Sequence, residues 1–250
     1  MLKNYFVLFL LGHIVGDFYF QTESMAYKKK KSLAYVLQHS LLYWLAMILF
    51  TLPILSYEIL LGATVASVLH CVIDIVKFNI SKKDKNDDIQ ERNLFIIDQI
   101  LHMIILFVIA FTLVLANVSP PGNYIFAELF NIIGISELKV IYWLCALLII
   151  HKPANIIIAK FIKQYKPADD NSQEKDQEKD QRAGRIIGTL ERIIMLLLIT
   201  INQYSAIGLV LTAKSIARNE KIAKDKNFAE YYLLGTLLSA LIAIVTSFIF

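Results

Sequence analysis

The chain has 250 residues, of which 57% are hydrophobic and 18% are charged, and its formal net charge is +4. Average soluble domains are less apolar, and several apolar runs here exceed the ~18 residues that indicate a membrane-spanning helix. Helical periodicity excludes an outer-membrane barrel, two cysteines exclude a disulfide framework, and no nucleic-acid signature is present. We therefore predict an all-α, polytopic helical bundle in a bacterial inner membrane.

Seven apolar segments predict the helices of this bundle. In chain order they cover about residues 2–21, 33–52, 57–80, 93–116, 138–162, 184–217 and 228–249. The first segment has features of a signal peptide, but His13 and Asp17 interrupt its apolar run and no small-residue cleavage site follows. We therefore expect it to be retained as the first helix.

The charges of the loops predict the orientation of the helices. Four lysines at 28–31 follow the first segment, and further basic clusters follow the third and the fifth. The connections at 52–57 and 117–137 contain neither Lys nor Arg. Because basic loops favour the cytoplasm, we expect the N-terminus outside and the basic loops in the cytoplasm. The second outer loop should contain a turn at 119–122 and a short interfacial helix near 124–133.

Composition also predicts the division of the chain. The segment QEKDQEKDQR at 173–182 is a charged, low-complexity linker that should lie in water. We expect a four-helix membrane domain at 1–118, an outer loop and fifth helix at 119–162, a charged cytoplasmic linker at 163–183, and C-terminal membrane helices at 184–250.

The C-terminal part departs from the loop-charge pattern. Lys214, Arg218 and Lys221 follow the sixth segment, so both of its ends should be cytoplasmic, which a single span cannot satisfy. Residues 186–213 therefore either span the membrane against this rule or enter and return. A returning segment would bend among Asn202, Gln203, Tyr204, Ser205 and Gly208.

Polar residues recur four positions apart in the apolar segments, which places them on one face of each helix. The set comprises His13, Asp17, Gln21, His39, His70, Asp74, Asp98, Gln99 and His102. At a rise of ~1.5 Å per residue, the expected orientation puts the histidines and aspartates of this set in one layer of the cytoplasmic half. Ionisable residues are costly inside a membrane, so this layer predicts a functional site.

Imidazole and carboxylate groups are ligands for zinc, iron and manganese, and pairs at i, i+4 present two ligands on one helix face. The expected ligands of a divalent metal, zinc first, are His13, His39, His70 and His102. The expected catalytic carboxylates are Asp17, Asp74 and Asp98, which complete the shell, orient the histidines or act as general base. Gln21 and Gln99 should contact the substrate.

A second polar group, formed by Arg185, Glu191 and Arg192, lies in the sixth segment. Guanidinium groups suit phosphate and carboxylate, so these residues are expected to hold an anionic headgroup. The alternative is an ion pair with Glu191 and contacts with lipid headgroups. In the first segment, Gly12 and Gly16 predict close helix packing.

The motifs GHIVGDFYFQT, LHCVIDIVK and DQILH, in this order over about residues 5–115, resemble a bacterial integral-membrane family catalogued as domain of unknown function 3307. The resemblance implies no activity. It implies that the motif positions of the family are His13, Asp17, Gln21, His70, Asp74, Asp98, Gln99 and His102. The chemistry is also similar to that of intramembrane hydrolases of the ceramidase and adiponectin-receptor type, whose motif order is not reproduced.

The sequence thus favours a membrane-embedded, metal-dependent hydrolase that acts on a lipid-like or other amphiphilic small molecule and contacts membrane lipids. Two alternatives stay open. One is a transporter or channel in which the same residues form a cation or proton site. The other is a non-enzymatic membrane scaffold in which the polar layer joins helices by hydrogen bonds.

Overall fold

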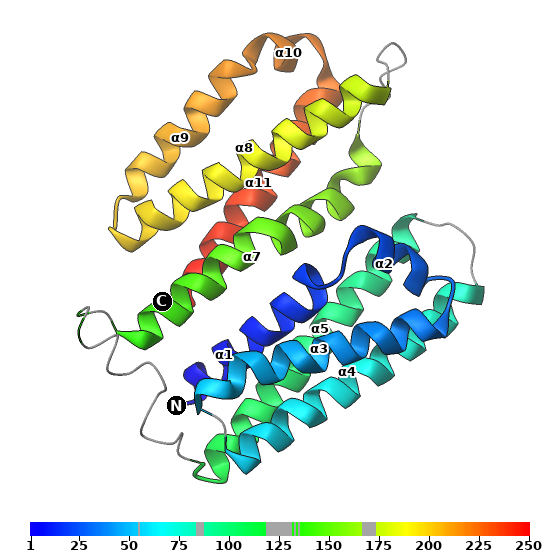
Figure 1. The fold of residues 1–250 in the computed structure, drawn as a ribbon. Helices are drawn as coiled ribbons and strands as arrows, with labels where there is room; N and C mark the ends of the chain where they lie inside the picture. The colour runs from blue at the N-terminus through cyan, green and yellow to red at the C-terminus, as the bar shows by residue number, and fades with distance from the viewer. Residues whose placement is uncertain (55, 84–87, 119–131, 133, 135, 167–173) are drawn as a thin grey trace. The chain divides into compact units, whose positions relative to one another are not determined.

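A computed structural model describes residues 1–54, 56–83, 88–118, 132, 134, 136–166 and 174–250. The turn expected at 119–122, and nearly all of the interfacial helix expected near 124–133, lie outside these ranges. Every regular element in the described part is helical, which confirms the all-α prediction (Figure 1). The chain divides into two compact units, Met1–Cys145 and Ala146–Phe250, and the division lies inside a helix.

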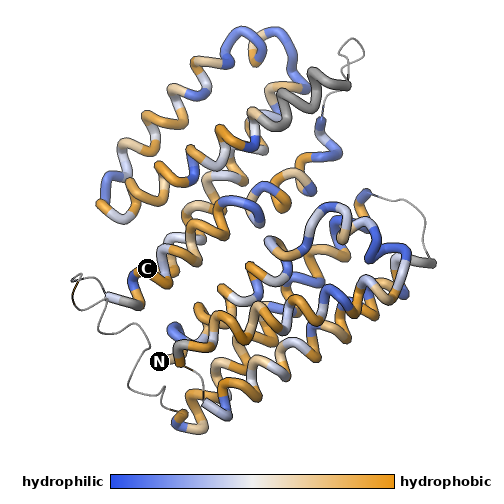
Figure 2. Tube along the Cα trace, in the orientation of Figure 1, coloured by the Kyte–Doolittle hydropathy of each residue, from blue (hydrophilic) through white to orange (hydrophobic). Residues whose placement is uncertain are grey.

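Among the described residues, five helices are long and apolar enough to cross a membrane. They contain the spans Leu33–Thr51, Tyr57–Ser81, Asp88–Leu115, Leu138–Tyr165 and Lys226–Ser247. Figure 2 shows that the long helices are largely hydrophobic along their length, whereas the short connecting helices α2 and α10 are hydrophilic. The prediction of a membrane protein is therefore supported.

The first unit is built around its first helix. Its elements are α1 (Leu2–Ile14), the π-helix η1 (Val15–Tyr19), α2 (Glu23–Lys29), α3 (Leu33–Thr51), the 3₁₀ turn η2 (Leu52–Ile54), α4 (Tyr57–Lys83) and α5 (Asp88–Leu115). Helix α1 packs against α3 and α5, and α4 packs against the same two helices. Every residue from 7 to 18 is buried, as expected for a helix that is apolar on all sides.

The outer surface of this unit is apolar. Five leucines spaced four residues apart on α3, from Leu33 to Leu49, are each 44–57% exposed. Similar exposed stripes follow α4 and α5, from Leu61 to Ile80 and from Ile97 to Leu115. Continuous apolar surfaces of this size are rare on soluble monomers and are typical of surfaces that face lipid.

The first helix differs from its prediction at its C-terminal end. A regular helix was expected over residues 2–21, but the chain widens into η1, in which the Phe20 N–H donates to the Val15 carbonyl at 2.8 Å. The helix ends at Tyr19, so Gln21 lies beyond it. That part of the prediction was wrong, because hydrophobic periodicity does not distinguish a π turn from an α turn.

The second unit contains the C-terminal part of α7 (Glu137–Ile162), η3 (Lys163–Tyr165), α8 (Glu174–Thr200), α9 (Tyr204–Ala217), α10 (Asn219–Lys224) and α11 (Lys226–Ser247). Helix α8 packs against α9 and α11. The first turns of α8 include residues 174–183 of the expected charged linker.

The predicted sixth segment is two antiparallel helices rather than one (Figure 1). The chain turns at 201–203, where Asn202 has a φ of 58°, and returns as α9. Gly208 lies inside α9 and not in the bend. The apolar part of α8, residues 186–200, is about 22 Å long and α9 is about 21 Å long, both shorter than the ~30 Å hydrocarbon core. This geometry matches the returning alternative.

Candidate metal centre

Two glycines bring the first helix close to α3 and thereby place Asp17. A Cβ atom on Gly12 would lie 2.8 Å from Met47 Sδ, and one on Gly16 would lie 2.8 Å from Tyr43 Cδ2. These contacts confirm the predicted close packing. Asp17 directly follows Gly16 inside the π-helix, and π turns are frequent at functional sites.

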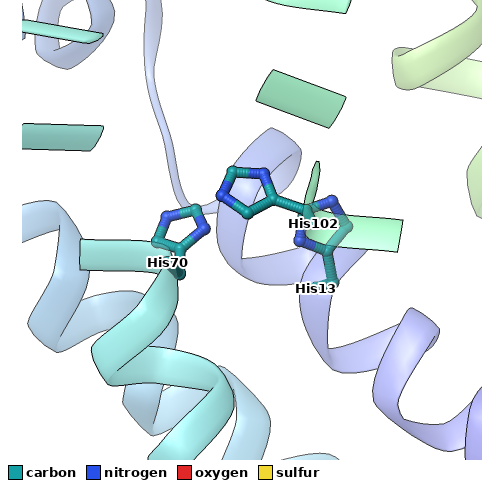
Figure 3. A group of neighbouring side chains, drawn as sticks. All are labelled: His13, His70 and His102. Carbon is teal, nitrogen blue, oxygen red and sulfur yellow. The ribbon is translucent and has the colours of Figure 1, made fainter. Parts of the chain in front are cut away.

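The structure brings eight of the predicted polar residues together in the first unit. They are His13 on α1, Asp17 on η1, His39 on α3, His70 and Asp74 on α4, and Asp98, Gln99 and His102 on α5. The seven ionisable members are all buried. Figure 3 shows the rings of His13, His70 and His102 gathered from three helices, and the centroids of the last two lie 4.4 Å apart.

Four potential ligand atoms converge at the centre of this layer: His39 Nε2, His70 Nε2, Asp17 Oδ1 and Asp74 Oδ2. The two nitrogens are 3.3 Å apart. His39 Nε2 lies 3.2 Å from Asp17 Oδ1 and 3.7 Å from Asp74 Oδ2. His70 Nε2 lies 4.0 Å from Asp17 Oδ1 and 3.4 Å from Asp74 Oδ2.

Asp17, His39 and His70 present ligand atoms 3.2–4.0 Å apart, close to the separations between the ligands of a tetrahedral metal. Bonds of about 2.0–2.1 Å to nitrogen and oxygen place tetrahedral ligand atoms about 3.3–3.4 Å apart. A hydrogen bond between the two Nε2 atoms requires a proton on one of them, which a metal ion would displace. A cation at this point would also compensate the burial of the two carboxylates. The residues present therefore fit a divalent metal.

His102 belongs to the same region. Both of its ring nitrogens are buried, and neither forms a hydrogen bond with any of the described residues. Ligand atoms of Asp17, Asp98 and His102 lie within 4.8 Å of one another, as do those of His13, His70 and His102. Buried polar atoms are rarely left unpaired, so His102 is available to a ligand.

The hydrogen bonds of Gln99 determine the proton position on His13. The Gln99 Nε2 amide donates to Asp17 Oδ2 at 2.9 Å and to Asp98 Oδ2 at 3.2 Å, so its Oε1 faces His13 Nε2 at 3.3 Å. Because an amide oxygen only accepts, His13 Nε2 carries the proton and Nδ1 accepts from Tyr43 Oη at 3.2 Å. Metal binding by His13 would therefore require the exchange of one of these partners.

Two lysines complete the layer on its partly exposed side. Lys29 Nζ donates to Asp74 Oδ2 at 2.7 Å and to Gln21 Oε1 at 2.9 Å, while Lys77 Nζ donates to Asp98 Oδ2 at 2.6 Å. Sequence reasoning did not assign either lysine to the site. For Lys77 a signal was present, because it lies three residues after Asp74 and hence on the same face of α4. No such signal was present for Lys29, because a run of lysines in a loop is usually interpreted as a determinant of membrane topology.

The second predicted group lies in the second unit. Arg192 is buried, and its guanidinium donates to the Ile150 carbonyl at 2.8 Å, to Ser239 Oγ at 3.0 Å and to Asn155 Oδ1 at 2.6 Å. It thus joins α8 to α7 and α11. Glu191 pairs with Lys214 at 2.7 Å rather than with Arg192, and Arg185 is exposed. The headgroup role predicted for these three residues stays a prediction.

Comparison with known families matches residues 5–124 to the family described as "Protein of unknown function (DUF3307)". This confirms the resemblance stated from the motifs, over almost the whole four-helix region that carries the site. No curated protein and no solved structure matches the chain.

Proposed function

We propose that this DUF3307 domain is a membrane-embedded, metal-dependent hydrolase that acts on a lipid-like or other amphiphilic substrate. One observation carries the proposal, namely the convergence of Asp17 Oδ1, His39 Nε2 and His70 Nε2 at separations of 3.2–4.0 Å, with Asp74 Oδ2 lying 3.4–3.7 Å from the two histidine nitrogens. His102 lies next to this group and supplies further ligand capacity. Zinc is the first choice of metal, since imidazole and carboxylate ligands at these separations suit it.

Different residues of the site have different roles in the proposed reaction. His39, His70, Asp17 and Asp74 would hold a divalent cation, which would supply Lewis acidity for the activation of water at neutral pH. Asp98 is the proposed general base, because its Oδ2 is engaged by Lys77 and Gln99 while its buried Oδ1 has no partner in the described part. Gln99 also orients His13 and Asp17 through its hydrogen bonds to both side chains.

The surroundings support an amphiphilic substrate. Helices α3, α4 and α5 expose apolar stripes, so a molecule with an acyl or isoprenoid tail can reach the domain through lipid. We place the domain in the bacterial inner membrane with the N-terminus outside and the polar layer in the cytoplasmic half, following the loop charges.

The test is the metal content of the purified full chain, measured by elemental mass spectrometry after incubation with zinc, iron or manganese. We expect about one equivalent of one metal in the wild type and loss of it in His70→Ala. The matched control is His151→Ala, because His151 is exposed on α7. A stable wild type without metal under all three conditions would overturn the proposal.

The hydrolytic role has its own variant. Asp98→Asn should keep the metal but lower turnover of amphiphilic ester and phosphoester substrates by about 10²- to 10⁴-fold, as expected on loss of a general base. Unchanged turnover in Asp98→Asn would refute the role of Asp98. Metal-dependent uptake into proteoliposomes without any hydrolysis would instead favour a transporter.

A further inference from the structure

Two ammonium groups lie beside the proposed metal centre and are not explained by metal binding. Lys29 Nζ is 2.7 Å from Asp74 Oδ2, and Lys77 Nζ is 2.6 Å from Asp98 Oδ2. The side chains of the lysines are 13% and 33% exposed, whereas those of the two aspartates are 3% and 5% exposed. The lysines therefore lie between the buried carboxylates and the surface of the unit.

The formal charge of the layer changes sign when a metal binds. Three aspartates and two lysines leave a charge of −1 with neutral histidines, so the layer attracts a cation. One divalent cation raises this charge to +1. A buried uncompensated charge is unfavourable in low dielectric, so the metal-loaded layer favours the binding of an anion.

The positions of Lys29 and Lys77 indicate which kind of anion would bind. Asp74 and Lys77 are three residues apart on α4 and share a face, and Lys29 reaches the same Asp74 from α2. Gln21 Oε1 accepts a second hydrogen bond from Lys29 at 2.9 Å, which holds the ammonium group in place. An ammonium group has three N–H donors, so Lys29 and Lys77 can each donate to a further acceptor while they stay beside Asp74 and Asp98.

We propose that Lys29 and Lys77 form an anion subsite that binds the phosphate group of the substrate next to the metal. Two ammonium groups and a cation present three separate positive charges, and a phosphate group has enough terminal oxygens to contact all three. This subsite implies that the substrate of the proposed hydrolase is a phosphorylated amphiphile. The inference rests on the proposed function.

The subsite predicts that metal and phosphate bind together. Binding of inorganic phosphate to the full chain in detergent is measured by equilibrium dialysis, with the retained metal present or removed by chelation. We expect metal to tighten phosphate binding by about tenfold or more. Lys29→Met and Lys77→Met should weaken it by about tenfold while keeping the metal, and Lys29→Arg and Lys77→Arg should restore part of it.

Lys28→Met is the matched control, because Lys28 lies on the same helix with its Nζ 5.2 Å from the Tyr35 ring centroid and takes no part in the layer. Competition by phosphatidic acid in mixed micelles, compared with inorganic phosphate alone, shows whether a lipid phosphate or free phosphate binds more tightly. Metal-loaded protein whose phosphate affinity is unchanged in Lys29→Met and Lys77→Met would overturn the subsite and leave the hydrolase intact. A wild type without metal would overturn both.

Discussion

Tyr43 supports two histidines at once. Its hydroxyl donates to His13 Nδ1, and its ring stacks on that of His70 with centroids 3.8 Å apart and planes 4° apart. The side chain is buried, so neither histidine ring can turn without moving it. Tyr43 is therefore a positioning residue for the layer.

We predict that Tyr43→Phe destabilises the protein by about 1–3 kcal/mol, because it leaves the buried Nδ1 of His13 without its donor while the stacked ring is kept. Chemical denaturation in detergent micelles measures the change in free energy of unfolding. Tyr57→Phe is the control, since Tyr57 is 76% exposed. Equal stability of the two variants would show that the hydroxyl does not support His13.

The site was predictable from the sequence where a residue type and a helical spacing coincide. His70 with Asp74, and Asp98 with His102, are four residues apart and reach the same layer. Lys29 was not predictable, because its place beside Asp74 depends on how the connection between η1 and α3 folds back. No local pattern encodes a contact across 45 residues.

At the scale of elements, the π-helix η1 is a feature that the sequence pattern could not predict. From Tyr5 to Tyr19 the first segment is apolar except at His13 and Asp17, so its helical character was predictable. The extra residue in the turn was not, because it accompanies the contact of Gly16 with Tyr43 on another helix. Gly16 lies both in the π turn and in this interhelical contact, and a contact between helices is not encoded in a local pattern.

We predict that Gly16→Ala destabilises the protein by about 1–3 kcal/mol, because the added Cβ would lie 3.1 Å from the backbone Cα of Tyr43 and the helices must separate. The shift should also lower the metal content, since Asp17 is the next residue. Thermal unfolding and elemental analysis measure the two effects. Gly184→Ala is the control, because no heavy atom lies within 4 Å of its new Cβ. A Gly16→Ala protein as stable as this control would contradict the packing argument.

At the scale of the whole molecule, the membrane bundle followed from composition, and the basic residues after the sixth segment already conflicted with a single span. In the structure this segment is a hairpin, in which α8 and α9 run in opposite directions (Figure 1). Short helices such as α2 and α10 were not predicted, because they are hydrophilic and their sequences lack an apolar stripe.

We predict that the two ends of this hairpin are on the same side of the membrane. Single cysteines at Arg185 and Asn219, in a chain with Cys71 and Cys145 replaced by Ala, should react with a membrane-impermeant thiol reagent in vesicles of the same orientation. A cysteine at Lys3 should react only in vesicles of the opposite orientation. Labelling of Arg185→Cys and Asn219→Cys from opposite sides would show that the segment crosses the membrane.

The central position of α1 has a consequence for synthesis. His13 is made 86 residues before Gln99, whose Oε1 accepts a hydrogen bond from His13 Nε2, and Asp17 is made 22 residues before His39. At about 5–20 residues per second, the first of these delays lasts roughly 4 to 17 s. During translation the ribosome therefore delivers a helix whose polar groups have no partners yet. The membrane-insertion machinery must therefore shield α1 from lipid until α5 has been synthesised.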